Sequence, residues 1–151
     1  MQQLTLWRIQ TIAVPWQFRT PILRCNMVFK IRTSKRTMEC FEEISASTNY
    51  APFILSKLAI SMSIKSGKPL VESDFCTDSY GLELNRQTIT GEWDELFKCL
   101  IEWFEKKHIN DDEYFQKYLK AHLDRGARFI HSEFKYSGDF LLGLLSNETS
   151  I

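Results

Sequence analysis

The sequence contains no run of about 20 apolar residues, the length that a membrane-spanning helix requires. It also lacks a GxxxxGK(S/T) phosphate loop, an HExxH metal motif, paired carboxylates in an apolar setting and the Ser/His/Asp order of a hydrolase. These absences leave enzyme chemistry without support. We therefore expect a soluble, cytoplasmic protein that is not an enzyme and that binds no cofactor.

Cysteine is scarce, and the four cysteines lie far apart in the chain, at Cys25, Cys40, Cys76 and Cys99. They form no CxxC pair, and no histidine lies at zinc-ligand spacing from them. This spacing favours reduced, buried thiols over a metal site or a catalytic nucleophile. His108, His122 and His131 form no ligand pairs at i, i+4, so we expect each at the surface or at a helix end.

Neither sign of charge is in excess, since 19 Lys and Arg balance 19 Asp and Glu, but the two signs are unevenly distributed. Residues 1–68 contain ten basic and three acidic side chains, a net charge of +7. Residues 69–151 contain nine basic and sixteen acidic side chains, a net charge of −7. A basic N-terminal half favours a polyanionic partner. The alternative is that folding interleaves the two sets, so that no coherent basic face forms.

The 151 residues, of which 44% are apolar, are enough for one domain with its own core. Residues 1–26 mix tryptophan, arginine and proline without the basic and long apolar regions of a signal peptide. We expect them to be a poorly ordered extension that precedes a natural start at Met27. The domain should then occupy residues 27–151.

The first part of this domain is predicted to be a strand followed by two helices. Within residues 28–32, apolar and basic side chains alternate from Phe29 onward, which is typical of a short strand. Thr33 or Ser34 can cap a helix that runs to about Thr48. Pro52 suits the first turn of a second helix.

The remainder is predicted to be a long connection followed by more helices, which makes the fold mainly α. Residues 82–89 of the connection should be extended. A helix at 92–107 has an apolar face, and another begins at Asp111 or Asp112. In this last helix Gly126 and Ala127 permit a close crossing, and the residues expected to face inward are Phe115, Leu119, Leu123 and Ile130. The apolar run at 140–145 should cover a core edge or a neighbouring subunit. The predicted apolar face of the 92–107 helix consists of Trp93, Leu96, Phe97, Leu100, Ile101 and Phe104.

Four basic side chains near the first helix form the main candidate for a DNA contact. Lys35 and Arg36 fall in the first helical turn, where cations oppose the helix dipole, so stability alone does not explain them. Together with Lys30, Arg32 and the free N–H groups of the helix start, they suit phosphate oxygens. The alternative is a set of merely solvated cations.

Two further basic residues are candidates for the same role. Arg86 lies in a polar run and can contact phosphate, or it can form an ion pair with Glu83 or Glu92 that fixes the loop. Lys57 projects from the polar side of the second helix and is a secondary candidate.

Several stretches resemble the DndE family, the small subunit of bacterial DNA phosphorothioation systems. The most specific is the run of glycines, amide, guanidinium and hydroxyls at Gly81–Glu92. The other matching stretches are Ile31–Lys35, Ala51–Leu55, Ala59–Ser63 and Tyr118–Gly126. The resemblance implies a mainly helical homotetramer that binds double-stranded, preferably nicked, DNA. It also implies that other Dnd proteins supply the sulfur-transfer and ATPase chemistry.

Two other functions fit parts of the sequence. A ribbon-helix-helix repressor also begins with a strand and two helices, and would place Lys30 and Arg32 in a major groove. A scaffold could instead dock partner proteins through the acidic half and the apolar tail without binding DNA. Sequence-specific binding to intact duplex is expected of the repressor, and no salt-sensitive DNA affinity is expected of the scaffold.

Overall fold

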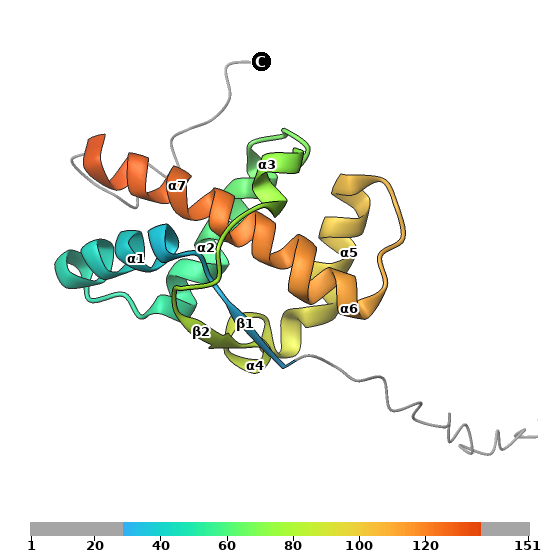
Figure 1. Ribbon diagram of the computed structural model, residues 1–151, viewed down its shortest axis with the longest axis horizontal. Coiled ribbons are helices and arrows are strands. Elements are labelled where there is room, and N and C mark those ends of the chain that lie inside the picture. The colour runs from blue at the N-terminus through green and yellow to red at the C-terminus, as the bar shows by residue number, and fades with distance from the viewer. Residues whose placement is uncertain (1–28, 137–151) are drawn as a thin grey trace, which may run out of the picture.

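The computed structural model describes residues 29–136, which form a mainly helical domain with one two-stranded sheet, as predicted (Figure 1). The expected N-terminal extension and the apolar run at 140–145 lie outside the described residues. The elements in chain order are β1 (Lys30–Arg32), α1 (Lys35–Thr48), α2 (Pro52–Lys65), α3 (Glu72–Phe75), β2 (Glu83–Asn85), α4 (Arg86–Ile89), the 3-10 helix η1 (Gly91–Trp93), α5 (Asp94–Glu105), α6 (Asp111–Glu113), the π-helix η2 (Tyr114–Leu119) and α7 (Lys120–Tyr136).

β1 and β2 form an antiparallel ribbon in which Ile31 lies opposite Leu84. Ile31 is buried and its basic neighbours are exposed, so the alternation in the sequence predicted this strand correctly. The extended segment predicted at 82–89 is only partly right, because its second half is helix α4. The Thr88 hydroxyl donates to the Asn85 carbonyl and the Thr90 N–H donates to the Arg86 carbonyl, which closes this turn.

Helices α1 and α2 confirm the two predicted helices. The Ser34 hydroxyl accepts a hydrogen bond from the Thr37 N–H at 3.2 Å and caps α1. α1 ends at Asn49, whose φ of 58° lies in the left-handed region that asparagine tolerates. Pro52 occupies the first turn of α2, where a backbone N–H is not needed.

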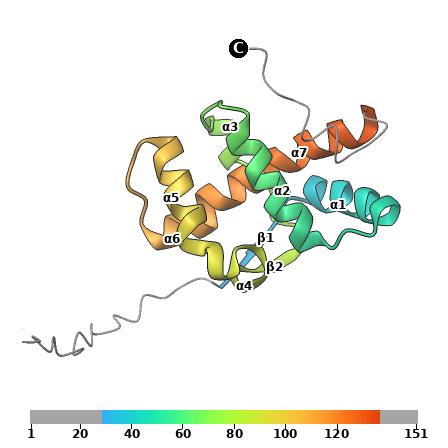
Figure 2. The same ribbon diagram turned by 180° about the vertical axis from the view of Figure 1, so that it is seen from behind.

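The contact between α2 and α7 is the most extensive between any two elements of the described chain. Figures 1 and 2 show α7 crossing α2 when seen from opposite sides. A Cβ atom at Gly126 of α7 would lie 1.8 Å from the carbonyl oxygen of Ala59 in α2. Ala59 and Ala127 are both fully buried. The prediction that Gly126 and Ala127 permit a close crossing is therefore confirmed.

The helix predicted to begin at Asp111 or Asp112 corresponds to α6, η2 and α7 together, with π-helical hydrogen bonding in its early part. Its predicted core residues Phe115, Leu119, Leu123 and Ile130 are all fully buried.

α5 matches the predicted helix at 92–107, but only part of its apolar face meets the core. Of the six residues predicted to face inward, Ile101 is buried and Phe97 and Phe104 are partly buried, whereas Trp93, Leu96 and Leu100 are exposed. The expectation for the exposed three was wrong, because α5 lies at the edge of the domain with neighbours on one side (Figure 1).

The α2–α7 crossing predicts the effect of adding one methyl group. The variant Gly126→Ala forces a Cβ against the backbone of Ala59, so its free energy of unfolding should fall by about 3 kcal/mol, the upper end for overpacking. Urea unfolding measures this change. Ser132→Ala, at an exposed position of the same helix, should stay within about 0.5 kcal/mol of the parent protein. Equal stability of the two variants would contradict a tight crossing.

Candidate nucleic-acid interface

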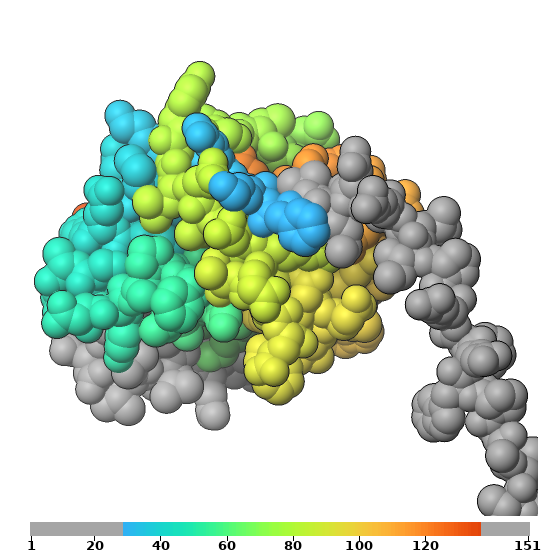
Figure 3. All heavy atoms as spheres, turned by 90° about the horizontal axis from the view of Figure 1, so that it is seen from below, coloured from blue at the N-terminus to red at the C-terminus, as the bar shows by residue number. Residues whose placement is uncertain are grey.

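Lys30 and Arg32 lie on the solvent side of the β-ribbon and share one carboxylate. Lys30 Nζ lies 2.7 Å from Glu83 Oε1, and Arg32 Nη2 lies 3.3 Å from Glu83 Oε2. The hydrogen bond from Lys30 is the main cause of a lowered Glu83 pKa. All three side chains are well exposed, and Figure 3 shows this side of the molecule, where β1 and β2 reach the surface. The ribbon therefore presents two cations and one anion to solvent.

The start of α1 does not offer the free N–H groups that the sequence suggested. The Lys35 N–H donates to Asp78 Oδ1 at 2.8 Å, and the Ser34 N–H donates to Asp124 Oδ1 at 3.0 Å. The helix start is thus bound by carboxylates of its own chain, which corrects the expectation. The Lys35 side chain remains exposed, with Glu39 as a distant partner at 3.9 Å.

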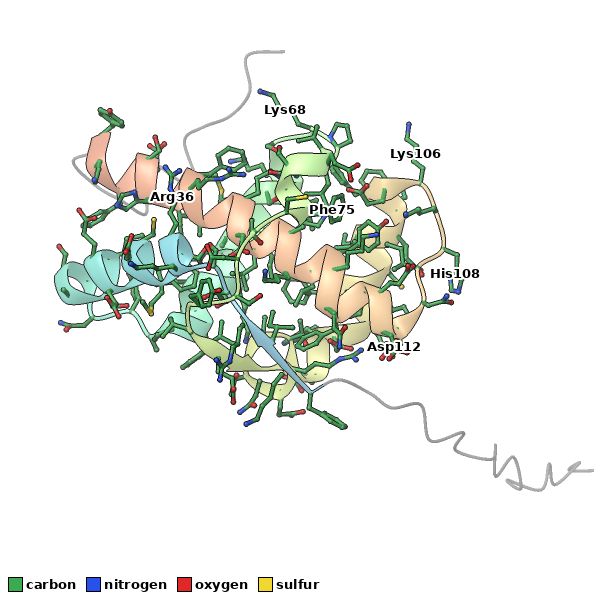
Figure 4. The ribbon with its side chains drawn as sticks, in the orientation of Figure 1. Arg36, Lys68, Phe75, Lys106, His108 and Asp112 are labelled. Carbon is green, nitrogen blue, oxygen red and sulfur yellow. The ribbon has the colours of Figure 1, made fainter. Side chains whose placement is uncertain are left out.

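Arg36 and Lys57 lie apart from the ribbon. Arg36 borders a cavity next to Arg128 and Asp124, and Figure 4 shows it beside α7. Lys57 lies on α2, with its Nζ 6.0 Å from the centre of the Phe53 ring. The basic residues of the N-terminal half are thus dispersed, and acidic residues of the C-terminal half lie among them. Folding interleaves the two charge sets in these places, as the alternative reading of the charge distribution required.

Arg86 is buried and held between two carboxylates. Its Nε lies 3.0 Å from Asp94 Oδ2, and its Nη1 lies 2.7 Å from Asp111 Oδ2. The guanidinium also lies over the rings of Tyr114 and Phe115. The hydrogen bond to Asp111 is the main cause of a raised Arg86 pKa and of a lowered Asp111 pKa. These contacts occupy the donors that the predicted phosphate contact needs.

The ion pair that was the alternative for Arg86 therefore exists, but with other partners than Glu83 or Glu92. Arg86 joins the β2–α4 segment to α5 through Asp94 and to α6 through Asp111. Asp111 is 25 positions away in sequence, so no local spacing indicated it.

The rest of the Gly81–Glu92 run also makes contacts within the chain. A Cβ atom at Gly81 would lie 2.3 Å from the Ser34 carbonyl oxygen, so glycine permits the close approach of this loop to the start of α1. Thr90 is buried, and its hydroxyl donates to Asp94 Oδ1 at 2.5 Å. The contacts of this segment are thus with other parts of its own domain.

Asp124 of α7 is a buried acceptor that the sequence did not reveal. In addition to the Ser34 N–H, it accepts from the hydroxyls of Thr37 and Thr77, each at 2.7 Å. These bonds attach α1 and the connection after α3 to α7. The Tyr118–Gly126 stretch thus supplies both this acceptor and the glycine of the helix crossing.

His122 is fully buried, although the sequence suggested a surface or helix-terminal position. Arg125 Nε donates to Ser63 Oγ at 2.8 Å, which leaves the Ser63 hydroxyl to donate to His122 Nδ1 at 2.9 Å. His122 Nε2 then faces Glu105 Oε1 at 3.6 Å, and neither atom has a hydrogen-bond partner. The order resembles a Ser/His/acid triad, but the Ser63 hydroxyl is buried and already paired, so this network is structural.

The remaining expectations concern metal sites, membrane helices and cysteines. Residues 29–136 hold no cluster of three metal-ligating side chains and no helix long and apolar enough to cross a membrane. Cys40, Cys76 and Cys99 are free thiols, although only Cys40 is buried. Cys25 lies outside the described residues.

A family model described as DNA sulphur modification protein DndE matches residues 30–137. The fold is similar to the crystal structure of DndE from Escherichia coli B7A involved in DNA phosphorothioation modification, at 19% identity and a TM-score of 0.55, covering 68% of this chain and 95% of that one. It is also similar to a DndE G21/24K mutant involved in DNA phosphorothioation, at 17% identity and a TM-score of 0.56, covering 68% of this chain and 97% of that one. No curated protein sequence is significantly similar.

The buried histidine predicts a pH dependence of stability. Burial lowers the pKa of His122 to about 3, below the value of about 6.5 in an unfolded chain. Between these values the unfolded chain binds more protons, so the free energy of unfolding decreases as the pH falls, by up to about 1.4 kcal/mol per unit. From pH 7 to pH 5, this contribution amounts to about 2 kcal/mol and should be absent in His122→Gln.

Urea unfolding at both pH values measures this difference. Ser132→Ala, which keeps His122, should retain the decrease of the parent protein. The same decrease in His122→Gln would mean that His122 is not held neutral in the folded protein.

Proposed function

The chain belongs to the DndE family of DNA sulphur modification proteins, and on this basis we propose that it serves DNA phosphorothioation as a non-catalytic, DNA-binding subunit. The family match covers most of the described domain, and the fold agrees with it. In this proposal the protein holds double-stranded DNA through its backbone phosphates. Other Dnd proteins, as the family resemblance implies, then carry out sulfur transfer and ATP hydrolysis.

The exposed cations of the ribbon and of the adjacent start of α1 carry the proposal for phosphate binding. The side chains of Lys30, Arg32 and Lys35 are 61%, 62% and 65% exposed, and their partners Glu83 and Glu39 are exposed as well. Such surface ion pairs are worth only about 0–1 kcal/mol, so a polyanion can displace the carboxylates. Phosphate contacts give affinity without reading bases, which suits a subunit that recognises DNA form.

The remaining sequence candidates take different places in this proposal. Arg36 and Lys57 are secondary contacts, because they lie outside the ribbon. Arg36 is on α1 and Lys57 is on α2. Arg86 is assigned a positioning role instead, since both carboxylates occupy its guanidinium. It holds the segment that contains β2, and through it the ribbon.

We further propose that nicked duplex is preferred, as the resemblance implies, and that the protein works in the cytoplasm as a homotetramer. The exposed apolar side chains of α5 support self-association. A ribbon-helix-helix repressor is less well supported, because its first strand pairs with the same strand of a second copy. Here β1 pairs with β2 of its own chain.

The ribbon predicts opposite effects of two sets of substitutions. The double variant Lys30→Ala, Arg32→Ala removes two phosphate contacts, so binding should weaken and the slope of log K against log salt should fall by about 1.8. Glu83→Gln removes the competing carboxylate and should strengthen binding several-fold at low salt. Lys68→Ala is the matched control, because this exposed lysine lies on the opposite side of the domain (Figure 4).

Gel-shift titrations with intact, nicked and single-stranded forms of one DNA sequence, and with a scrambled sequence, measure these effects. Preference for the nicked duplex regardless of sequence supports the proposal. Sequence-dependent binding to intact duplex would instead indicate a repressor. No binding to any form would indicate a scaffold, and equal effects of the ribbon variants and Lys68→Ala would exclude the ribbon as the contact.

A further inference from the structure

α5 carries a stripe of large apolar side chains on its outer side. Trp93, which immediately precedes α5, and Leu96, Leu100 and Trp103 are 55%, 51%, 38% and 75% exposed. Their spacings of three, four and three residues place them along one side of the helix. The adjoining side of α5, with buried Ile101 and half-buried Phe97, faces the core. A surface with two exposed tryptophans in line is typical of a protein interface.

The stripe reads the same in both directions along the helix. Trp93 and Trp103 lie five residues on either side of Lys98, and Leu96 and Leu100 lie two residues on either side. When two copies of such a helix pack antiparallel about a twofold axis, each tryptophan meets a tryptophan and each leucine meets a leucine. This symmetry is what an interface between identical copies requires.

The charges beside the stripe fit the same arrangement. Glu92 lies in η1 just before α5, and Lys106 follows α5; both are exposed, and they lie seven residues on either side of Cys99. In an antiparallel pair, Glu92 of each copy approaches Lys106 of the other, so opposite charges meet twice. In a parallel pair, the two copies of each residue would lie on opposite sides of the interface, and these charges would not meet. The exposed Cys99 lies midway between Glu92 and Lys106 in the sequence, so the antiparallel arrangement brings the two Cys99 residues close to the axis.

The end of the stripe also offers a hollow for an inserted side chain. Trp103 borders a cavity that Ile64, Pro69 and Phe104 line with apolar surface. In the antiparallel arrangement, this end of α5 receives the tryptophan at position 93 of the second copy. Aromatic anchors beside apolar hollows are where interfaces gain most of their binding energy.

We propose that α5 of one copy packs antiparallel against α5 of a second copy, about a twofold axis that passes between Leu96 and Leu100. The stripe thereby forms an isologous interface, and the occupant of this apolar face is a second copy of the chain. The inference deepens the proposed homo-oligomer and rests on it. It involves none of the cations assigned to DNA, so the two proposals can fail separately.

Cross-linking through Cys99 tests the twofold axis directly. A protein in which Cys25, Cys40 and Cys76 are replaced by alanine is treated with a short bismaleimide, because cysteines on the flank of a helix pair lie too far apart for a disulfide. A covalent dimer is expected on a denaturing gel. The matched control keeps Cys76, also exposed, and replaces Cys99; it should stay monomeric. Monomer alone from the Cys99 protein, or equal cross-linking of both, would overturn the proposal.

Two sets of variants test the same interface without cysteine chemistry, in DNA-free buffer. Leu96→Glu with Leu100→Glu places carboxylates in the apolar contact and should lower the mass seen by sedimentation, whereas Lys117→Glu on η2 should not. Glu92→Lys should raise the dimer Kd several-fold, and added Lys106→Glu should restore it, because the charges then match again across the pair. An unchanged mass in the leucine variant would overturn the proposal. The proposal would also fail if the parent protein were a monomer whose own residues 140–145 cover the stripe.

Discussion

The guanidinium of Arg86 is the contact on which the arrangement of the two proposed surfaces depends. It bonds Asp94 at the start of α5 and Asp111 at the start of α6, while its own backbone follows β2. The β1–β2 ribbon and helix α5 are therefore fixed relative to each other by one side chain. A charge buried with its partners contributes little net stability, but loss of one partner from a buried pair costs about 3–5 kcal/mol. Arg86 thus favours one arrangement of these segments over looser ones.

α7 plays the corresponding role on the other side of the domain. Its Asp124 accepts hydrogen bonds at the start of α1, and its Gly126 lets α2 approach closely. Two of the stretches that resemble the family, one around Arg86 and one around Asp124, therefore hold the domain together. The exposed side chains of β1 and α5 remain for contact with other molecules. Recognition and assembly are thus divided between different residues of one small domain.

Local patterns in the sequence predicted the local elements. The alternation around Ile31, the proline of α2 and the glycine of the α2–α7 crossing each act within a few residues, and each prediction was confirmed. The partners of Arg86 could not be predicted, because Asp111 is brought near only by the tertiary fold. The pattern of α5 indicated a helix, but not how many of its sides have neighbours. The burial of His122 depends in the same way on α2 and α5, which a sequence does not place in space.

Lysine footprinting with and without nicked duplex would test most directly whether the ribbon is the DNA contact. The protein is acetylated briefly in low salt, and the modification of each lysine is quantified by mass spectrometry. Binding through the ribbon slows acetylation of Lys30 and Lys35, while Lys68, which Figure 4 shows on the far side from the ribbon, reacts at an unchanged rate. Protection of Lys68 with none at Lys30 would place the DNA elsewhere and contradict the assignment.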